Sequence, residues 1–189
     1  GMFTGFIRVK GKPLGLIANN PLFLAGAIDS DGADKASRFI KLCENYNIPI
    51  LSLCDTPGMM VGPEIEETGL VRHCCRLFLA GANVTVPMMT IVLRKAYGLG
   101  AQAMAGGSFM APQFVVGWPT AEIGAMGLEG AVKLGYRKEL EAESDVEKKE
   151  KLFKKLVDDL YEKGKAINAA SLLELSLIHI SEPTRQNQI

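Results

Sequence analysis

The sequence predicts an α/β protein in which parallel strands are joined by helical crossovers. Two observations support this fold class. Residues 48–58 and 86–98 contain nearly continuous apolar runs, a pattern typical of strands that are covered on both faces. Segments with apolar residues at helical spacing alternate with these runs, and glycine turns follow the strands, as helical crossovers between parallel strands require.

The first part of the chain predicts a hairpin, a helix and a strand. Residues 6–20 predict two short strands around a turn at 10–13. Residues 29–47 predict a helix with Asp31 as its N-cap, because apolar residues recur there at helical spacing. The apolar run over 48–58 then predicts a buried strand that ends in a Pro-Gly turn.

The second part continues this alternation. Residues 64–84 predict a single helix, residues 86–98 predict a second buried strand, and a further helix is expected to begin at Leu99. Residues 114–126 predict one more strand, and residues 127–142 begin a helical region.

Residues 139–165 differ in composition from the rest of the chain. Charged residues dominate, but one apolar stripe persists at helical spacing, formed by Leu152, Phe153, Leu156, Val157 and Leu160. This pattern predicts an amphipathic helix. Two interpretations stay open, a helix with a solvated outer face and a helix that docks a partner.

The composition argues against several classes of protein. Hydrophobic residues make up 48% of the chain, enough for a sizeable core. The 21 basic and 21 acidic residues balance, so no basic field favours a nucleic-acid partner. No long uninterrupted apolar span and no signal peptide are evident in the sequence, which predicts a cytoplasmic protein without a membrane partner.

The cysteines favour a structural role. Cys43, Cys54, Cys74 and Cys75 lie inside apolar runs and lack the spacing of zinc ligands, so we expect no metal site. They predict reduced core cysteines of a cytosolic protein.

Candidate ligand sites lie in the turns that follow the predicted strands, because ligands gather at the carboxyl ends of parallel strands. The turns at 55–58, 97–101 and 118–120 qualify. The stretch RKAYGLGAQAMAGG places Gly98 and Gly100 just before small residues that suit a helix. Such a helix N-terminus leaves backbone N–H groups for an anion. The alternative is a tight turn needed only for packing.

Other polar residues allow a functional and a structural interpretation. Asn19 and Asn20 end a predicted strand, where they either hydrogen-bond across a pocket or form an Asx turn. Arg94 and Lys95 end another strand, where they either neutralise a carboxylate or form ion pairs. His73 lies on a predicted helix without a matching serine and acid, which argues against a hydrolase triad.

Several motifs, in order along the chain, resemble the carboxyltransferase component of biotin-dependent acyl-CoA carboxylases. They are GLIANNP, AGAIDSDGADKASRFIKLCENYNIPILSLCDTPGMMVG, GLVRHCCRLFLAGANVTVPMMTIVLRKAYG and WPTAEIGAMGLEGAV. The resemblance is to the C-terminal half of the propionyl-CoA carboxylase β-type and covers about residues 5–170. It implies a crotonase/ClpP-like ββα superhelix in a homo-oligomer, with the active site between two halves at a subunit interface.

The resemblance also implies a reaction and its partners. Carboxylate is transferred from N1 of carboxybiotin to the α-carbon of an acyl-CoA, without a metal or a nucleophilic side chain. Biotin is the cofactor and is carried as carboxybiotin on a separate biotin carboxyl carrier protein, which a biotin carboxylase charges. This half of the protein is expected to hold the biotin side.

By the family's pattern, the turn at Gly98 and the following residues is the oxyanion hole. The backbone N–H groups of Leu99 and Gly100 are the expected donors, with Ala101 as third choice, and each such donor typically lowers the barrier by about 3 kcal/mol. The propionyl type reads Gly-Gly-Ala-Tyr-Asp at residues 98–102, where this chain reads GLGAQ. Gln102 therefore stands at the position of the aspartate. Because that aspartate position influences acyl-chain choice, Gln102 leaves the acyl-CoA open.

The loop after the strand at 48–58 matches the family's PGF-x-x-G turn. Pro57, Gly58 and Met59 are therefore expected to border the biotin ring, with Met59 as a flexible apolar wall in place of the usual aromatic residue. Asn20 is a further candidate for substrate binding. An ordinary turn after a strand is the alternative at 57–59.

Two other functions stay open. The first is a biotin-dependent decarboxylase or another crotonase-type CoA-ester enzyme, although no paired carboxylates of a hydratase are evident in the sequence. The second is an inactive half-site fragment.

The C-terminal residues fit nothing before them. Residues 175–185, LSLIHISEPTR, can be encoded by the codons of a common transposase sequencing adapter. We therefore expect residues 175–189 to be a sequencing artefact and residues 1–174 to be a fragment, the C-terminal domain of a carboxyltransferase. A natural coil tail is the alternative.

Overall fold

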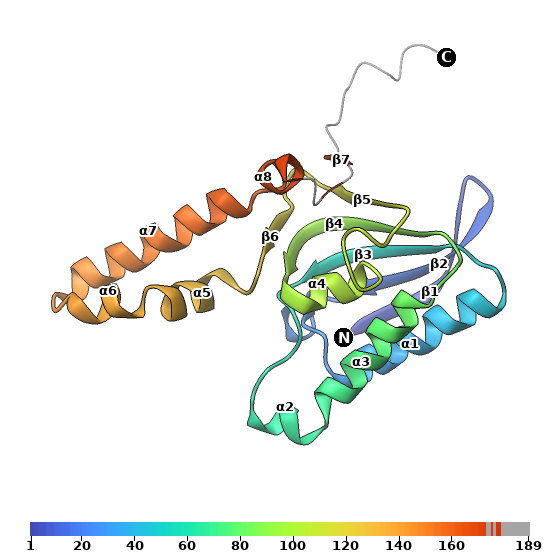
Figure 1. Ribbon diagram of the computed structural model, residues 1–189, viewed down its shortest axis with the longest axis horizontal. Coiled ribbons are helices and arrows are strands. Elements are labelled where there is room, and N and C mark those ends of the chain that lie inside the picture. Colours follow the sequence, from blue (N-terminus) through green and yellow to red (C-terminus); the bar gives the residue numbers. More distant parts are fainter. Residues whose placement is uncertain (173–174, 176, 179–189) are drawn as a thin grey trace, which may run out of the picture.

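The structure, a computed structural model, describes residues 1–172, 175 and 177–178 and is built around one mixed sheet (Figure 1). Its strands are β1 (Met2–Val9), β2 (Lys12–Asn19), β3 (Ile50–Thr56), β4 (Met88–Tyr97), β5 (Phe114–Gly117), β6 (Glu122–Gly124) and β7 (Leu177–Ile178). The order across the sheet is β1-β2-β3-β4-β5-β7, and β6 also pairs with β4. From β2 onward the described strands pair with one another in parallel, which confirms the predicted α/β class.

The hairpin of β1 and β2 is the antiparallel part of the sheet. Lys10 and Gly11 connect the strands, and their φ angles of +48° and +79° are both positive. Such a two-residue turn matches the right-handed twist of the flanking strands. The hairpin was predicted, but its first strand begins earlier than the sequence indicated.

Four helices precede the last part of the sheet. They are α1 (Ser30–Asn45), α2 (Pro63–Glu67), α3 (Leu70–Ala82) and α4 (Gly98–Met104), and a 3-10 turn, η1 (Leu24–Gly26), comes before α1. Helix α1 packs against β1 and β2, whereas α4 packs against β3 and β4. Helix α3 lies against both α1 and α4 (Figure 1).

The N-cap of α1 is Asp29, so the prediction of Asp31 was wrong. Asp29 has an extended backbone, and its carboxylate accepts a hydrogen bond from the Gly32 N–H at 2.8 Å. Asp31 lies one residue inside the helix, in the first turn, where its charge complements the helix dipole. Both aspartates suit a helix start, and only the backbone conformation distinguishes them.

The single helix predicted over 64–84 is two helices. Gly69 adopts a left-handed conformation with φ of +71°, and it separates α2 from α3. Thr68 supports the break, because its hydroxyl donates to the Ile65 carbonyl oxygen at 2.7 Å. The apolar spacing continues across the break, which is why the pattern alone predicted one helix.

The single strand predicted over 114–126 is also two elements. Strand β5 pairs with the first half of β4, and β6 pairs with its last residues. A turn at Trp118 separates them, since the Ala121 N–H donates to the Trp118 carbonyl oxygen at 2.9 Å. Pro119 lacks an N–H and cannot continue the ladder of β5. The long strand β4 therefore carries two successive partners on one side.

Helices α5 (Leu128–Gly135), α6 (Arg137–Ala142) and α7 (Val146–Gly164) form an arm that extends from the sheet, and α8 (Ala166–Ser171) follows (Figure 1). Helix α7 packs against α5 and α6. Its predicted apolar stripe is half-buried, whereas the charged residues between are exposed. The amphipathic helix is thus confirmed, although it begins later than the charged segment does.

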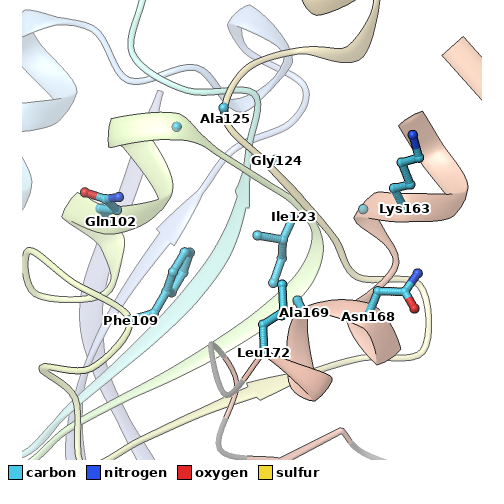
Figure 2. Close-up of a pocket in the computed structure, with 11 residues that line it drawn as sticks. Gln102, Phe109, Ile123, Gly124, Ala125, Lys163, Asn168, Ala169 and Leu172 are labelled. Atoms are coloured by element: carbon cyan, nitrogen blue, oxygen red, sulfur yellow. The ribbon is translucent and has the colours of Figure 1, made fainter. Parts of the chain in front are cut away.

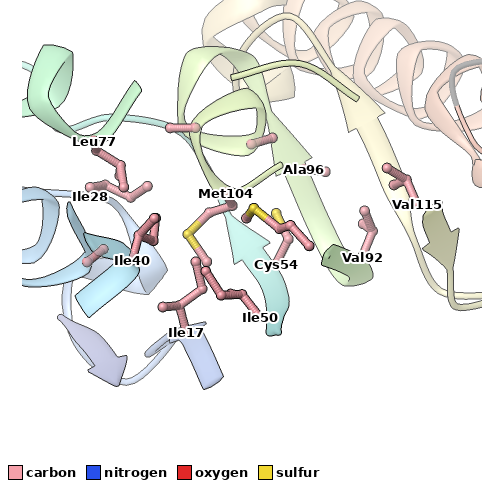
Figure 3. Packing of buried hydrophobic residues seen from close by; sticks show 14 of the residues in the cluster. Ile17, Ile28, Ile40, Ile50, Cys54, Leu77, Val92, Ala96, Met104 and Val115 are labelled. Atoms are coloured by element: carbon pink, nitrogen blue, oxygen red, sulfur yellow. The ribbon is translucent and has the colours of Figure 1, made fainter. Parts of the chain in front are cut away.

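Buried side chains from the sheet and the helices form one core (Figure 3). Fully buried members include Ile17, Ile50, Val92 and Val115 from strands and Ile40, Leu77 and Met104 from helices. Each such side chain contributes about 1.5–3 kcal/mol on burial. This packing fixes the strands whose carboxyl ends carry the candidate site.

All four cysteines are free thiols. Cys43, Cys54 and Cys74 are buried, as predicted for core cysteines, but Cys75 is exposed. Cys75 follows Cys74 on α3, and successive helical residues face different directions. The helix therefore buries one of the two neighbours only.

The segment 175–189 lies mostly outside the described residues. Within it, Leu175 is buried, and β7 pairs in parallel with β5. The assignment of this segment to a sequencing adapter, and of 1–174 to a carboxyltransferase C-terminal domain, stays a prediction.

Candidate active site

The first turn of α4 and the turn after β3 pack directly on each other. A Cβ atom placed on Gly100 would lie 2.7 Å from Gly58 Cα and 2.6 Å from the Gly58 carbonyl carbon. No side chain fits at Gly100, so glycine is what permits the close approach of the two backbones. Two turns that the sequence indicated separately therefore meet at one place.

The turn at Gly58 is held by its neighbours. Its φ of +126° is a conformation that favours glycine. The Gly58 carbonyl oxygen accepts a hydrogen bond from the Ile28 N–H at 3.0 Å, and the Gly58 N–H donates to the Thr56 hydroxyl at 3.2 Å. The backbone that faces Gly100 is thus fixed from two elements.

The N-terminus of α4 presents backbone N–H groups that the helix does not use. Tyr97 is the N-cap with an extended backbone, so the Ala101 N–H is the first that reaches a carbonyl four residues back. The N–H groups of Leu99 and Gly100 precede it, and outside α4 neither has an acceptor within the described residues. Neither group is used by another described element, whereas the Ala101 N–H lies where the hydrogen-bond ladder of the helix begins.

Gly98 joins this turn to strand β6. Its φ is +56°, and a Cβ atom there would lie 2.7 Å from the Ala125 carbonyl oxygen. A side chain would therefore be strained and would collide with the backbone that follows β6. The first turn of α4 is confined on one side by Gly58 and on the other by Ala125.

Gln102 lines a pocket of about 360 Å³ beside this turn (Figure 2). Gln102 and Phe109 lie on one side, Lys163 and Asn168 lie on the other, and Ile123 lies between them (Figure 2). The pocket thus joins α4 and β6 to the junction of α7 and α8. Its wall combines amide, ammonium and apolar groups, a composition suited to a polar organic ligand.

A second pocket of about 390 Å³ lies on the other face of β6. Pro57, Lys95, Tyr97 and Glu122 line it, together with residues at the start of α5. Successive residues of a strand point to opposite faces, so Glu122 faces this pocket while Ile123 faces that of Gln102. The predicted residues Pro57 and Gln102 therefore line different pockets.

The sequence indicated a candidate turn that begins at Tyr97, but it did not indicate Glu122 or the bond between these two side chains. The Tyr97 side chain is buried, and its hydroxyl donates a short hydrogen bond to Glu122 Oε2. Burial, and next the Glu122 carboxylate, raise the pKa of the Tyr97 phenol, which therefore stays protonated and keeps donating. The two residues are distant in sequence, and no local pattern marks them as partners.

Three polar or apolar candidates near the strand ends take structural positions. Met59 is half-buried with its sulfur 3.2 Å from Cys74 Sγ on α3, and it lines neither of the two pockets described above. Asn20 forms the Asx turn, because its Oδ1 accepts from the Leu22 N–H at 3.1 Å. Asn19 Oδ1 accepts from the Asp55 N–H at 3.1 Å and so joins the ends of β2 and β3.

His73 takes part in an ion-pair cluster between helices. Its Nδ1 lies 3.0 Å from Asp34 Oδ2 on α1, and Arg76 Nη1 lies 3.1 Å from the same oxygen. Partial burial would raise the pKa of Asp34, but the hydrogen bonds and charges of His73 and Arg76 outweigh it and lower that pKa. His73 on α3 thus helps to join this helix to α1.

Arg94 forms an ion pair rather than facing either pocket. Its Nε lies 3.4 Å from Asp55 Oδ1, which also accepts the Lys95 N–H at 3.2 Å. Lys95 itself lines the pocket of Tyr97 and Glu122. The ion-pair interpretation is thus confirmed for Arg94, while a role of Lys95 in neutralising a carboxylate stays a prediction.

Within residues 1–172, 175 and 177–178, no group of three or more His, Cys, Asp or Glu side chains is placed to hold a metal ion. None of the described helices is long and apolar enough to cross a lipid bilayer.

Comparisons with known proteins match the chain to a described family. The family model described as "Carboxyl transferase domain" matches residues 1–182. The propionyl-CoA carboxylase beta chain of Cereibacter sphaeroides is 44% identical over 139 residues, which cover 74% of this chain and 27% of that protein.

Two solved structures agree with this match. A single-chain, multi-domain long-chain acyl-CoA carboxylase is 53% identical with a TM-score of 0.86, over 95% of this chain and 18% of that one. The transcarboxylase 12S hexamer, with methylmalonyl-coenzyme A bound, is 33% identical with a TM-score of 0.84, over 94% of this chain and 34% of that one. The predicted crotonase-type fold is confirmed, and the chain spans about a quarter of the length of the curated relative.

Proposed function

Because the chain belongs to the carboxyl transferase domain family, we propose that it serves the carboxyltransferase step of a biotin-dependent acyl-CoA carboxylase. The reaction moves a carboxylate from carboxybiotin to the α-carbon of an acyl-CoA. The observation that carries the proposal is the pair of N–H groups at Leu99 and Gly100, beside the close contact with Gly58. In this proposal the chain is the C-terminal half of the carboxyltransferase and holds the biotin side.

The chemistry of the site fits biotin. Two N–H donors without acceptors outside their helix suit a single oxygen that gains negative charge, such as that of the ureido group. Glycine at 98 and 100 keeps side chains away from this oxygen. Carboxybiotin, when bound, supplies the carboxyl group, and the chain's contribution is to bind and orient its oxygen.

The Gln102 pocket is the proposed place of the acyl group. Gly98 in the first turn of α4 lines this pocket, so a ligand there would reach the residue that precedes the two N–H donors. Gln102 and Asn168 offer neutral hydrogen-bonding groups, and Ile123 and Phe109 offer apolar walls. Acetyl-, propionyl- and longer acyl-CoAs are the candidate substrates, and Gln102 is the residue that we expect to select among them.

We also propose that the protein works in an assembly with partner proteins and with further copies of itself. A biotin carboxyl carrier protein presents the biotin, a biotin carboxylase charges it, and the site is completed across a subunit interface of a homo-oligomer. A cytoplasmic location belongs to the same proposal and agrees with the free thiols of the chain. Both pockets beside β6 are open to solvent in this chain, which agrees with a site that a second half completes.

The test follows labelled carboxylate. The full-length product of the gene is incubated with carboxylated biotin carrier and with acetyl-, propionyl- and longer acyl-CoAs. Transfer to at least one acyl-CoA supports the proposal. Carrier binding without transfer to any CoA ester contradicts it and indicates a decarboxylase or another acceptor.

A second arm tests the N–H donors directly. Proline is tolerated in the first turn of a helix but lacks the N–H, so Leu99→Pro removes one donor. Leu99→Ala removes the same exposed side chain and keeps the donor. We expect the proline variant to transfer carboxylate about 100-fold more slowly than the alanine variant. Equal rates would show that this N–H is not used.

A further inference from the structure

We propose that Tyr97 and Glu122 form a positioning pair that sets the orientation of the N–H donors at Leu99 and Gly100. This inference rests on the proposed function, since it assigns a role to residues outside the turn itself. Neither residue touches the anion in this account. They act through the first turn of α4.

The pair bridges two neighbouring strands at the entry to α4. Tyr97 is the last residue of β4 and lies opposite Gly124 of β6, while Glu122 lies opposite Lys95. The Tyr97 hydroxyl donates to Glu122 Oε2, so the bond crosses between the strands. The Tyr97 side chain is 3% exposed and is therefore held almost entirely by protein.

The Tyr97 ring is also confined by backbone. A Cβ atom on Gly124 would lie 3.2 Å from Tyr97 Cδ1 and 3.3 Å from its Cε1, so the ring packs closely against this glycine. Contact on the ring and a hydrogen bond at its tip together fix the side chain. One contact alone would leave the ring free to tilt along the strand.

Tyr97 controls the turn because it is the N-cap residue of α4. Its φ of −108° and ψ of 135° set the direction in which the helix leaves β4. Its side chain makes no capping hydrogen bond, so nothing from Tyr97 blocks the free N–H groups. A rotation at Tyr97 would turn the peptide planes of Leu99 and Gly100 together.

The polar bond indicates a geometric role rather than simple stabilisation. A phenylalanine at 97 would keep the packing on Gly124 and would avoid burying a hydroxyl beside a carboxylate. Polar groups that are buried together fix one arrangement, because other arrangements leave them unpaired. The carboxylate accepts from the hydroxyl in one orientation of the ring.

Glu122 extends the pair to the wall of the Gln102 pocket. It also forms an isolated antiparallel bridge with Lys165, at the junction of α7 and α8. Lys163 and Asn168 on either side of that junction line the pocket of Gln102. A shift of Glu122 would therefore change the donor turn and the acyl pocket relative to each other.

The test compares four variants in the full-length product of the gene. Tyr97→Phe and Glu122→Leu each remove the bond and should lower kcat for carboxyl transfer about tenfold, with KM for the acyl-CoA changed less than about twofold. Glu122→Gln keeps an acceptor oxygen and should recover most of kcat. Tyr46→Phe, at a side chain that is 70% exposed, should match the wild type.

The double variant Tyr97→Phe/Glu122→Leu should lose no more activity than either single variant, because both remove the same bond. Full kcat in both single variants would overturn the pair, as would a multiplicative loss in the double variant. Crystal structures of Tyr97→Phe and of the wild type give a readout that does not depend on activity. A displaced first turn of α4 supports the inference, and an unmoved turn overturns it even if the proposed reaction is not found.

Discussion

Asn19 ties the carboxyl end of β2 to that of β3, because its side-chain oxygen accepts the Asp55 backbone N–H at 3.1 Å. Both residues are more than nine-tenths buried. Because the site is buried, water could not take the place of Asn19 as the acceptor for the Asp55 N–H. One side chain therefore joins the end of β2, which precedes η1, to the end of β3, which precedes the Gly58 turn.

Replacing Asn19 should destabilise the fold. Asn19→Ala leaves the buried Asp55 N–H unpaired, and we expect the free energy of unfolding to fall by about 1–3 kcal/mol. Urea unfolding followed by circular dichroism measures the change. Asn45→Ala, at an exposed position near the end of α1, is the control and should change the free energy little. Equal effects at both positions would contradict the role of Asn19.

A methyl group at Gly100 should be enough to disturb the site. It would press into the Gly58 backbone, and overpacking of this kind costs about 1–3 kcal/mol. We expect Gly100→Ala to lower both the free energy of unfolding and the rate of carboxyl transfer. Gly135→Ala is the matched control, since its added Cβ meets no atom within 4 Å. A Gly100→Ala variant with wild-type stability would show that the two turns can separate freely.

Gln102 should influence the choice of acyl-CoA. Gln102→Asp places a negative charge beside Phe109 and Ile123 in the same pocket, and we expect the ratio of kcat/KM for propionyl-CoA and acetyl-CoA to change about tenfold. The ratio is measured with both substrates in competition. Gln113→Asp adds the same charge at an exposed position before β5 and should leave the ratio unchanged. An unchanged ratio in Gln102→Asp would place the acyl group elsewhere.

The cysteines should react in an order set by burial. Burial raises the pKa of the Cys54 thiol to about 12, and burial followed by the charges of Cys75 and Glu66 raises that of Cys74 to about 11. A pH of 8 lies far below both pKa values, so only a small fraction of each thiol is present as the reactive thiolate. We expect iodoacetamide to label Cys75 first, as read by mass spectrometry of the native protein. Cys75→Ser should remove the fast phase, and rapid labelling of Cys54 would contradict its burial.

The sequence predicted the elements well where one physical pattern dominated. The apolar runs of β3 and β4 were clear because strands covered on both faces need apolar residues throughout. Patterns failed where a single backbone conformation decided the outcome. Gly69 breaks a helix whose apolar spacing continues, and Asp29 rather than Asp31 has the extended backbone of an N-cap.

The sequence likewise predicted only part of the candidate site. The glycines of the α4 turn were found because a strand, a tight turn and a helix start lie together in the sequence. The bond between Tyr97 and Glu122 was missed because it depends on the pairing of β4 with β6, and residues 114–126 did not indicate β6 as a separate strand. Likewise, no local signal places the sulfur of Met59 against Cys74.

Strand β4 pairs first with β5 and then with β6, so residues 118–121 between these two strands act as a spacer. Residues 89–92 of β4 pair with β5, and residues 95–97 pair with β6. The length of the spacer sets how far along β4 the second strand docks. A one-residue insertion there would exchange the two faces of β6, turning Glu122 from Tyr97 and Ile123 from Gln102, while β5 and the core beneath it kept their register. Evolution, or an engineer, can thus retune the walls of both pockets by changing loop length without altering any residue of the sheet.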